Sequence, residues 1–179
     1  LKNVEKYFND TSLVSNSSFF LPYLSGERTP HNDPHIRGSF HAMKTTTDAT
    51  NLQYAVIEGV SFGILDGVNS ILKVNDNFDK IFMVGGGSRS SFWIELIASL
   101  LQRNLSVCDQ SEFGAALGVA RLAMHVDKNI QDRNNIIKEI KISKKYKPQL
   151  DRIDLLKKRY KIWKDLYSSN KKIAPTLLA

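Results

Sequence analysis

Cysteine and long apolar runs are what this sequence most clearly lacks. Cys108 is the only cysteine among 179 residues, which excludes an intrachain disulfide and any zinc site built from several cysteines. Such cysteine usage is typical of a reducing compartment. No apolar run approaches the roughly 18 residues that cross a bilayer, and residues 1–5 lack the design of a signal peptide. We therefore expect a cytoplasmic protein with no membrane partner.

An initiator methionine is also missing, since the sequence begins at Leu1. We therefore expect a piece of a longer protein. What is present is ordinary for a globular domain: 42% of the residues are hydrophobic and 24% are charged. A length of 179 residues is enough for one compact domain with a sizeable core and an extension.

The net charge of +7 is concentrated in the last part of the chain. Residues 128–179 hold 15 lysines and arginines against 5 acidic residues, whereas residues 1–127 hold 10 against 13. A basic stripe can bind phosphates, so a nucleic-acid-binding module is one alternative. The last predicted helix, however, has an apolar seam apart from most of its lysines, and we expect it to dock on its own domain, with no nucleic-acid partner. The seam residues are Ile153, Leu156, Tyr160, Trp163 and Tyr167.

The most informative stretch, residues 80–93, predicts a strand, a tight turn and a helix. Residues 81–84 are apolar without alternation, as in a strand that is covered on both faces inside an α/β sheet. After three glycines, apolar residues recur at helical spacing from Phe92 to Leu101, which indicates a helix with one face on that sheet.

The three glycines, Gly85, Gly86 and Gly87, are thus expected at the carboxyl end of a strand and the amino end of a helix. Unpaired N–H groups and the helix dipole favour an anion there, and glycine lets a ligand approach the backbone closely. The next residues, 88–92, include Arg89 but no carboxylate, although acidic residues are the usual choice at this place. A nucleotide fits this pattern. The alternative, that the glycines only turn the chain tightly, stays open.

The first part of the chain predicts little chemistry. Residues 1–18 look like a loop or the frayed end of a helix, and residues 19–43 predict two short strands joined by a long loop with prolines. His31, Asp33 and His35 lie in that loop, but nothing nearby supplies a further ligand. We therefore expect a surface loop rather than a metal site.

A long helix is predicted next, and either Asp48 or Thr50 can cap its start. Apolar residues recur from Ile57 to Ile71 at three- and four-residue steps. We expect its acidic residues, Glu58 and Asp66, to face solvent or a domain seam.

Small residues mark two predicted helices. In the first, Gly59, Gly63 and Gly67 each weaken the helix by up to about 1 kcal/mol relative to alanine, so we expect a close neighbour along that line. The second, residues 112–124, follows a predicted strand at residues 105–109, and for it both tight packing and contact with a flat ligand stay open. Beyond it, to about position 149, we expect a loop with some helix.

The dinucleotide-binding plan is the main rival. It needs a strand, Gly-x-Gly, a helix and an acid at the end of the next strand, places that Gly85, Gly87 and Asp109 could fill. Ser90 occupies the place of the third glycine. The phosphate-loop pattern is absent, because no Gly-Lys-Ser/Thr follows the glycines. A dinucleotide-dependent oxidoreductase domain is the alternative from a different class.

Four motifs in order resemble one known family. They are FLPYLSGERTPHNDP at residues 20–34, AVIEGV at 55–60, VGGGSRSSFW at 84–93 and ALGVA at 116–120. Together they closely resemble the C-terminal domain of the FGGY carbohydrate kinases.

The resemblance implies an α/β fold of the actin-like, ribonuclease-H-like ATPase type, with a mixed sheet flanked by helices. Residues 19–126 would form the C-terminal domain, residues 1–18 a linker or the truncated end of a preceding region, and residues 127–179 a basic helical extension on the same domain. In this fold two such domains close over ATP and a sugar. The implied partner is the N-terminal FGGY domain of the same parent chain.

Carried over to this sequence, the family's glycine-rich loop implies a binding site for the adenosine and α-phosphate side of ATP or ADP. Gly85, Gly86 and Gly87 would let the nucleotide approach the backbone. Ser90 stands where a relative has an asparagine that contacts the nucleotide, and Arg89 adds positive charge. Mg²⁺ would be held mainly by the nucleotide and the other domain.

The family's chemistry needs parts that this sequence lacks. A kinase of this class uses an aspartate as general base and an Asp-x-Gly-Thr-type loop for phosphates and Mg²⁺, and Asp66, in mid-helix, does not replace them. Phosphoryl transfer depends on positioning and charge neutralisation from both sides. We therefore expect a carbohydrate kinase as the full-length protein and an inactive fragment. The resemblance at residues 25–31 implies D-xylulose as substrate, with gluconate, ribulose, rhamnulose and glycerol as alternatives. A homo-oligomer is left open.

Overall fold

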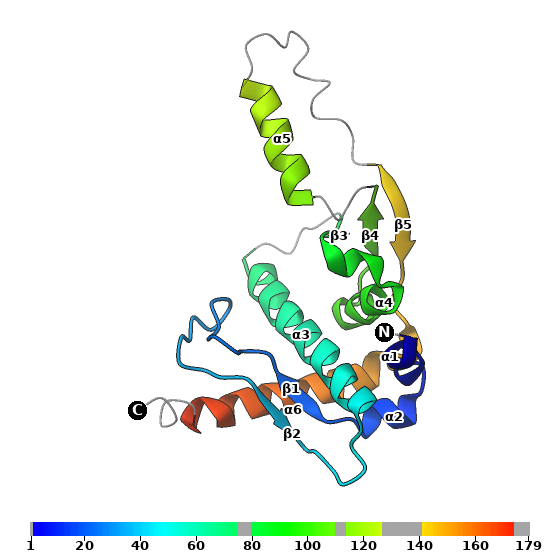
Figure 1. Ribbon diagram of the computed structural model, residues 1–179, viewed down its shortest axis with the longest axis vertical. Coiled ribbons are helices and arrows are strands. Elements are labelled where there is room, and N and C mark those ends of the chain that lie inside the picture. Colours follow the sequence, from blue (N-terminus) through cyan, green and yellow to red (C-terminus); the bar gives the residue numbers. More distant parts are fainter. Residues whose placement is uncertain (1, 75–79, 110–113, 127–140, 174–179) are drawn as a thin grey trace.

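The structure, a computed structural model, describes residues 2–74, 80–109, 114–126 and 141–173 (Figure 1). Its helices are α1 (Lys2–Phe8), α2 (Thr11–Ser15), α3 (Ala49–Leu72), α4 (Ser91–Leu101), α5 (Gly114–Val126) and α6 (Ile153–Ile173). Its strands are β1 (Phe19–Leu21), β2 (Ser39–His41), β3 (Phe82–Met83), β4 (Leu105–Cys108) and β5 (Ile142–Tyr146). Short 3₁₀ helices at Gly86–Arg89 and Leu150–Arg152 come before α4 and α6.

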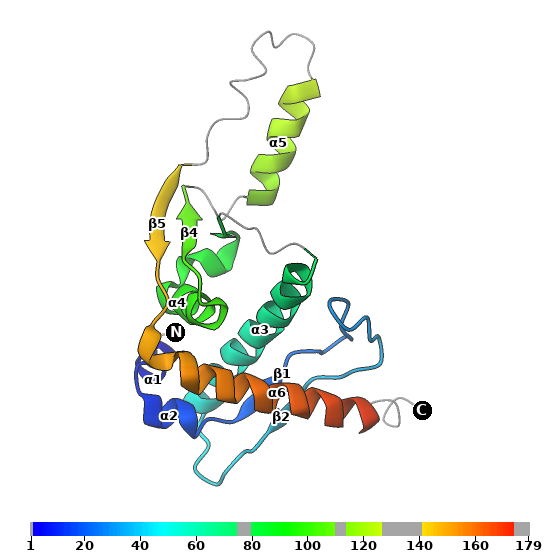
Figure 2. The ribbon, with the colours of Figure 1, turned by 180° about the vertical axis from the view of Figure 1, so that it is seen from behind.

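Helix α3 runs through the middle of the molecule and contacts β1, α1, α4 and α6, as Figures 1 and 2 show from opposite sides. Asp48 caps its start by accepting a hydrogen bond from the N–H of Asn51, as predicted. The predicted apolar stripe is only partly buried, because Ile64 and Ile71 are exposed. The buried face lies to one side of that stripe, where Tyr54 and Phe62 are fully buried.

The glycines of α3 differ in what surrounds them. At Gly59 an added Cβ atom would lie 2.2 Å from the carbonyl oxygen of Phe20, so β1 crosses the helix there in direct contact. At Gly63 the nearest atom, from Pro22, would be 3.9 Å away, and at Gly67 nothing lies within 4 Å. The predicted close neighbour is therefore confirmed at Gly59 alone.

Helix α6 docks on the rest of the chain through the predicted seam. Leu156, Trp163 and Tyr167 are buried, and the indole N–H of Trp163 donates a hydrogen bond to the carbonyl of Phe20. Side chains from α6, α3 and β1 thus share one core.

A buried ion pair joins α6 to α3. Arg159 donates to both carboxylate oxygens of Glu58, at 2.7 and 2.6 Å, and the two side chains are 4% and 1% exposed. Burial alone lowers the pKa of a guanidinium, but the adjacent carboxylate outweighs it, and the pKa of Arg159 is raised. The prediction that Glu58 faces solvent or a domain seam is wrong. Its partner lies far along the chain, which helical periodicity does not reveal.

Asp66 also has protein partners instead of facing solvent, and its side chain is 13% exposed. One carboxylate oxygen lies 2.9 Å from the Nε2 atom of His31, and the other accepts the hydroxyl of Tyr160 at 2.5 Å. The loop between β1 and β2 is tied a second time by Asp33, whose carboxylate lies within hydrogen-bond distance of the Tyr167 hydroxyl. The loop is therefore held against both α3 and α6.

A second core lies under a three-stranded sheet in the order β3-β4-β5. β3 is parallel to β4, whereas β5 is antiparallel to it, so the sheet is mixed and flanked by helices, as predicted. Strand β5 falls where we expected a loop with some helix, and that prediction is wrong for residues 142–146. Residues 81–84 are less buried than predicted, with Val84 59% exposed.

Helices α1 and α2 occupy most of residues 2–15, so of the two alternatives for this part, a loop or the frayed end of a helix, the loop is wrong. Val4, Phe8 and Val14 are 1% exposed each. Asp10 caps α2 by accepting hydrogen bonds from the N–H groups of Ser12 and Leu13. Together with Tyr7, the three apolar side chains belong to the core, which the polar composition of this part did not indicate.

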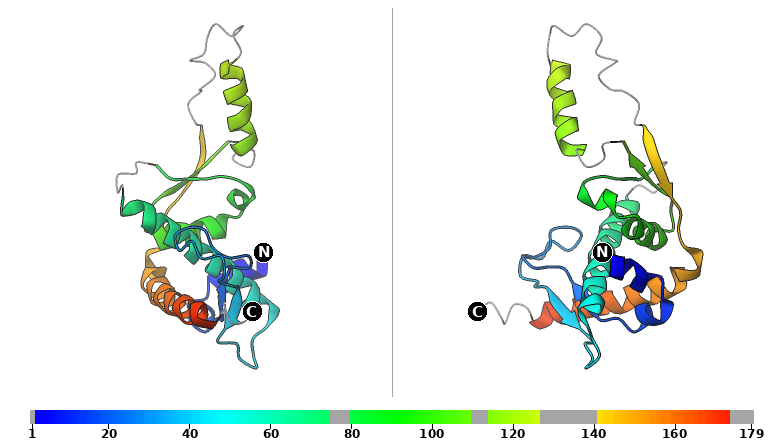
Figure 3. Two further views of the ribbon diagram at one scale, coloured as in Figure 1. Left: turned by 90° about the vertical axis from the view of Figure 1, so that its left-hand side faces the viewer. Right: turned by 45° about the vertical axis from the view of Figure 1, so that its right-hand side comes forward.

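Helix α5 projects away from the rest of the molecule (Figures 1 and 3). Four of its apolar side chains are exposed: Val119 by 67%, Leu122 by 68%, Met124 by 49% and Val126 by 77%. Tight packing against a neighbouring helix, one of the two predicted roles of its small residues, is not seen among the described residues.

Candidate functional site

The glycine turn joins β3 to α4, as predicted. Gly85 has φ 81°, in the region that side chains strain to adopt, so glycine is required there by the backbone. The N–H of Ser88 donates to the carbonyl of Gly85, and that of Ser90 to the carbonyl of Gly87, which closes a 3₁₀ turn immediately before α4. The turn thus delivers the chain directly to the start of a helix.

The other two glycines are required for different reasons, if at all. An added Cβ atom at Gly87 would lie 2.8 Å from the indole ring of Trp93, so this glycine makes room for a side chain of the protein itself. At Gly86 nothing lies within 4 Å of an added Cβ atom. The tight turn therefore explains why position 85 is glycine, and packing against Trp93 explains position 87. Neither reason applies to Gly86, which borders open space.

The amino end of α4 faces the same open space. Ser90 is the capping residue by position, but its hydroxyl makes no cap hydrogen bond, and the first turn holds no acidic residue. The first N–H groups of a helix have no partner within the helix and carry its positive dipole end. An anion beside Ser90 would therefore find donors that the side-chain cap does not occupy.

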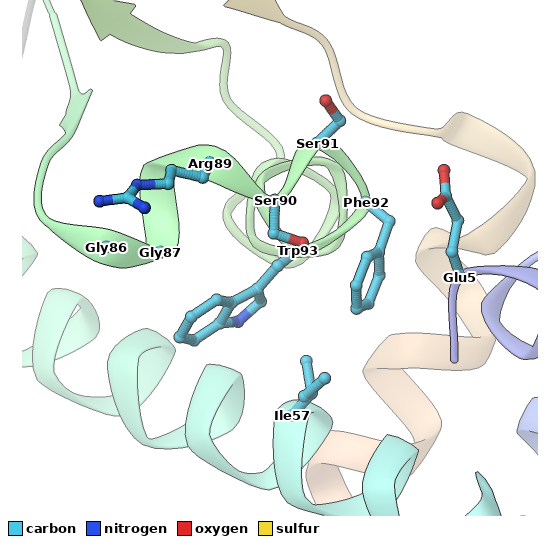
Figure 4. A pocket seen from close by; sticks show the side chains of 9 residues that line it. All are labelled: Glu5, Ile57, Gly86, Gly87, Arg89, Ser90, Ser91, Phe92 and Trp93. Carbon is cyan, nitrogen blue, oxygen red and sulfur yellow. The ribbon is translucent and has the colours of Figure 1, made fainter. Parts of the chain in front are cut away.

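A cavity of about 580 Å³ opens beside the turn (Figure 4). This is within the range of about 300–1,000 Å³ typical of ligand pockets. Its lining comes from the turn, from α4 and from two distant helices: Gly86, Gly87, Arg89, Ser90, Ser91, Phe92, Trp93, Ile57 and Glu5. Four of the five residues predicted for the site thus line one cavity, whereas Gly85 is part of the turn but does not line the cavity.

The charged side chains of this cavity lie at opposite sides. In Figure 4, Arg89 extends from the turn on one side and Glu5 stands on α1 at the other, with the rings of Phe92 and Trp93 between them. The cavity therefore offers a cation, an apolar middle and a carboxylate in that order.

The sequence did not point to several of these residues. Phe92 and Trp93 follow the last glycine after four residues, in the first turn of α4, and could have been found from that position. Ile57 and Glu5 come from α3 and α1, and only the tertiary fold brings them to the turn.

Asp109, the acidic residue that the dinucleotide-binding plan needs, contacts Lys141 instead of the cavity. Asp109 follows β4, and its carboxylate lies 3.9 Å from the ammonium group of Lys141. Its N–H donates to the carbonyl of Lys141, so the residue belongs to the connection of β4 with β5. It does not line the cavity.

The predicted loop residues do not form a metal site in the described part of the chain, where no group of three or more His, Cys, Asp or Glu side chains could hold an ion. The carboxylate of Asp33 accepts the N–H groups of His35 and Ile36. His31 stacks on the ring of Tyr167, with centroids 4.0 Å apart. These side chains fasten the loop.

The sequence matches the FGGY family of carbohydrate kinases, C-terminal domain, over residues 5–126. Among curated proteins, it is 30% identical to the xylulose kinase of Escherichia coli over 149 residues, which is 83% of this chain and 31% of that protein.

Solved structures give the same picture. The crystal structure of a xyloylose kinase from Brucella ovis matches with a TM-score of 0.79 at 32% identity, over 96% of this chain and 35% of that one. The gluconate kinase of Lactobacillus acidophilus matches with a TM-score of 0.73 at 26% identity, over 95% and 35%. The chain thus spans about a third of the length of the relatives that it matches.

Proposed function

The chain belongs to the FGGY family of carbohydrate kinases, as its C-terminal domain, and from this premise we propose that it is the nucleotide-binding half of an ATP-dependent sugar kinase. Gly85, Gly86, Gly87, Arg89 and Ser90 would bind the adenosine and α-phosphate side of ATP or ADP. The observation that carries the proposal is the open cavity at the junction of a bare turn with a helix amino end.

The chemistry assigned to these groups follows from their positions. The N–H groups at the start of α4 would donate to a phosphate oxygen, and Arg89 would neutralise part of its charge. Gly86 would let the nucleotide reach the backbone, since nothing occupies the space beside it. Mg²⁺ would be bound through the nucleotide and the other domain, where it would neutralise charge on the transferred phosphoryl group.

We propose the complete kinase as the unit that catalyses the reaction, with D-xylulose converted to D-xylulose 5-phosphate. Support comes from the names of two relatives that are 30% and 32% identical to this chain over the parts that align. A gluconate kinase at 26% identity keeps the choice of sugar open to the alternatives of ribulose, glycerol and gluconate. The general base and the phosphate loop would lie outside this chain, which alone would be inactive.

The proposed partner is the remaining part of that kinase, including its N-terminal domain. Exposed apolar side chains favour it: Leu122 and Val126 on α5, Val84 after β3, and Ile71 on α3. We also propose residues 19–126 as the ATPase-like domain, residues 127–179 as its extension, and a cytoplasmic location.

The test is binding of ADP to the purified chain by calorimetry, with Gly86→Leu as the key variant. A leucine there would enter open space, so the fold should persist while ADP binding falls at least about tenfold. Gly118→Leu, on exposed α5, is the control, because an added Cβ atom there also meets nothing within 4 Å. Equal binding by both variants would refute the site.

Measurements with other ligands test the alternative classes of function. An oxidoreductase domain would bind NAD in preference to ADP. A nucleic-acid-binding tail would bind DNA or RNA with an affinity that falls steeply with salt concentration. Turnover of xylulose and ATP by this chain alone would contradict the proposal that it is half of a site.

A further inference from the structure

The two ends of the candidate cavity carry opposite charge. Arg89 and the amino end of α4 form its basic side, and Glu5 forms its acidic side, with aromatic rings between (Figure 4). A ligand that fits both sides carries an anionic group at one end and a neutral ring with a hydrogen-bond donor at the other. An adenine nucleotide has this arrangement: phosphates at one end, and an exocyclic amine at the far edge of the base.

Trp93 is held in place at this cavity. Its indole N–H donates to the hydroxyl of Ser61 on α3 at 2.9 Å, and its ring packs against Gly87. The indole is partly exposed, whereas Trp163, the other tryptophan of the sequence, is 0% exposed. A fixed, partly exposed ring is a surface on which a base can stack without loss of side-chain freedom.

Glu5 differs from the other acidic side chains near α3. Glu58 is used in the ion pair with Arg159, and Asp66 in the contacts with His31 and Tyr160. Glu5 is exposed on α1 and lines the cavity. A carboxylate only accepts hydrogen bonds when ionised, so at the base end it favours an amine and disfavours a carbonyl oxygen.

We propose that Trp93 and Glu5 make this cavity selective for the adenine base: the indole stacks on the base, and the Glu5 carboxylate accepts a hydrogen bond from its exocyclic amine. The inference rests on the proposed nucleotide function of the site and adds the residues that choose the base. Hypoxanthine has an oxygen in place of that amine, so an inosine nucleotide would place two acceptors against each other.

The first experiment compares binding of ADP and IDP by calorimetry. ADP should bind about tenfold more tightly, since a hydrogen bond to a charged group is replaced by a repulsive contact. Glu5→Gln should bring the two affinities to within about threefold, because an amide can accept from the amine or donate to the oxygen. Asp165→Asn, on the exposed face of α6, is the control for the loss of one negative charge and should keep the preference.

The second experiment uses the fluorescence of the two tryptophans. ADP should quench emission in the unchanged chain, because only Trp93 lies at the cavity. Trp93→Phe should abolish the quenching yet bind ADP within about threefold, since phenylalanine still offers a ring, and Trp93→Leu should bind about tenfold more weakly.

The outcomes distinguish a failure of this inference from a failure of the proposed nucleotide-binding function. If ADP and IDP bind equally, or Glu5→Gln leaves the preference unchanged, the role of Glu5 is refuted while the nucleotide site stands. If ADP binds without quenching, stacking on Trp93 is refuted. If neither nucleotide binds, the proposed function fails.

Discussion

Helices α5 and α6 differ in how much of their apolar surface is buried. α6 is rich in lysine, yet Leu156 and Trp163 on its inner face are at most 1% exposed. α5 is mostly apolar, yet Leu122 and Val126 are 68% and 77% exposed. The apolar side chains of α6 pack against other described elements, whereas those of α5 do not.

The difference indicates where this chain is self-sufficient. Around α3 and α6, apolar contacts are reinforced by the buried pair of Glu58 with Arg159 and by the contacts of Asp66. Around α5, apolar side chains meet solvent. We infer that the first region folds on this sequence alone, and we propose that α5 packs against another part of the complete protein.

The comparison predicts the largest loss of stability when the buried ion pair is broken. Arg159→Ala should lower the free energy of unfolding by about 3–5 kcal/mol, because Glu58 would remain buried without its partner. Denaturant unfolding of the chain measures this. Lys158→Ala is the control, since that side chain is exposed, and should change stability by less than about 0.5 kcal/mol. A loss below about 1 kcal/mol for Arg159→Ala would contradict the structure.

The next largest effect is expected at the crossing of β1 and α3. Gly59→Ala should destabilise by about 1–3 kcal/mol or more, because the new methyl group would lie 2.2 Å from the carbonyl oxygen of Phe20. Gly67→Ala, eight residues along the same helix, should stabilise by up to about 1 kcal/mol, since it gains helix propensity in open space. Unfolding midpoints of the pair should therefore move in opposite directions, and a shift in the same direction would refute the crossing.

A smaller effect is expected in acid. Burial raises the pKa of Asp33, but it is outweighed by the combined effect of hydrogen bonds from the N–H groups of His35 and Ile36, the charge of Lys171 and the hydrogen bond of Tyr167, so the pKa is lowered overall. A lowered pKa means that this carboxylate stabilises the fold above about pH 4 and loses that contribution as the pH falls through its folded pKa. Unfolding measured between about pH 5 and pH 2 should thus show a shallower loss of stability for Asp33→Asn than for the unchanged chain. Parallel curves would show that Asp33 contributes nothing in acid.

The smallest effect on this chain is expected on α5. Changing Val119 and Leu122 together to lysine should alter the free energy of unfolding by less than about 0.5 kcal/mol per site, because both side chains are exposed. Leu96→Ala, at a fully buried position of α4, is the contrasting variant and should cost about 2–5 kcal/mol. In the complete kinase the lysine changes should reduce stability or activity. A large loss in the chain alone would instead place α5 against the described core.

Local pattern predicted much of the secondary structure. Regular spacing of apolar residues predicted α4 and α6, an acidic cap predicted the start of α3, and the glycines predicted the turn before α4. Pattern failed where the cause was not local. Strand β5 has three exposed residues and is a strand because β4 offers it a partner edge, and residues 2–15 are helical although their composition is polar.

The candidate site divides in the same way. The order of residues along the chain was enough to bring Gly86, Arg89 and Ser90 to a strand-to-helix junction, because neighbours in sequence stay neighbours in space. The far walls of the cavity, Glu5 and Ile57, come from two other helices, and their arrival depends on how α1 and α3 pack.

By itself the sequence determined the family, the glycine turn and the apolar face of α6, since motifs and periodicity are written in consecutive residues. Tertiary structure alone decided that Glu58 is buried, that only Gly59 among the three glycines of α3 has a close neighbour, and that the apolar side chains of α5 are exposed. The physical reason is that a side chain is buried only when a second surface packs against it. That second surface is supplied by residues far along the chain or outside it.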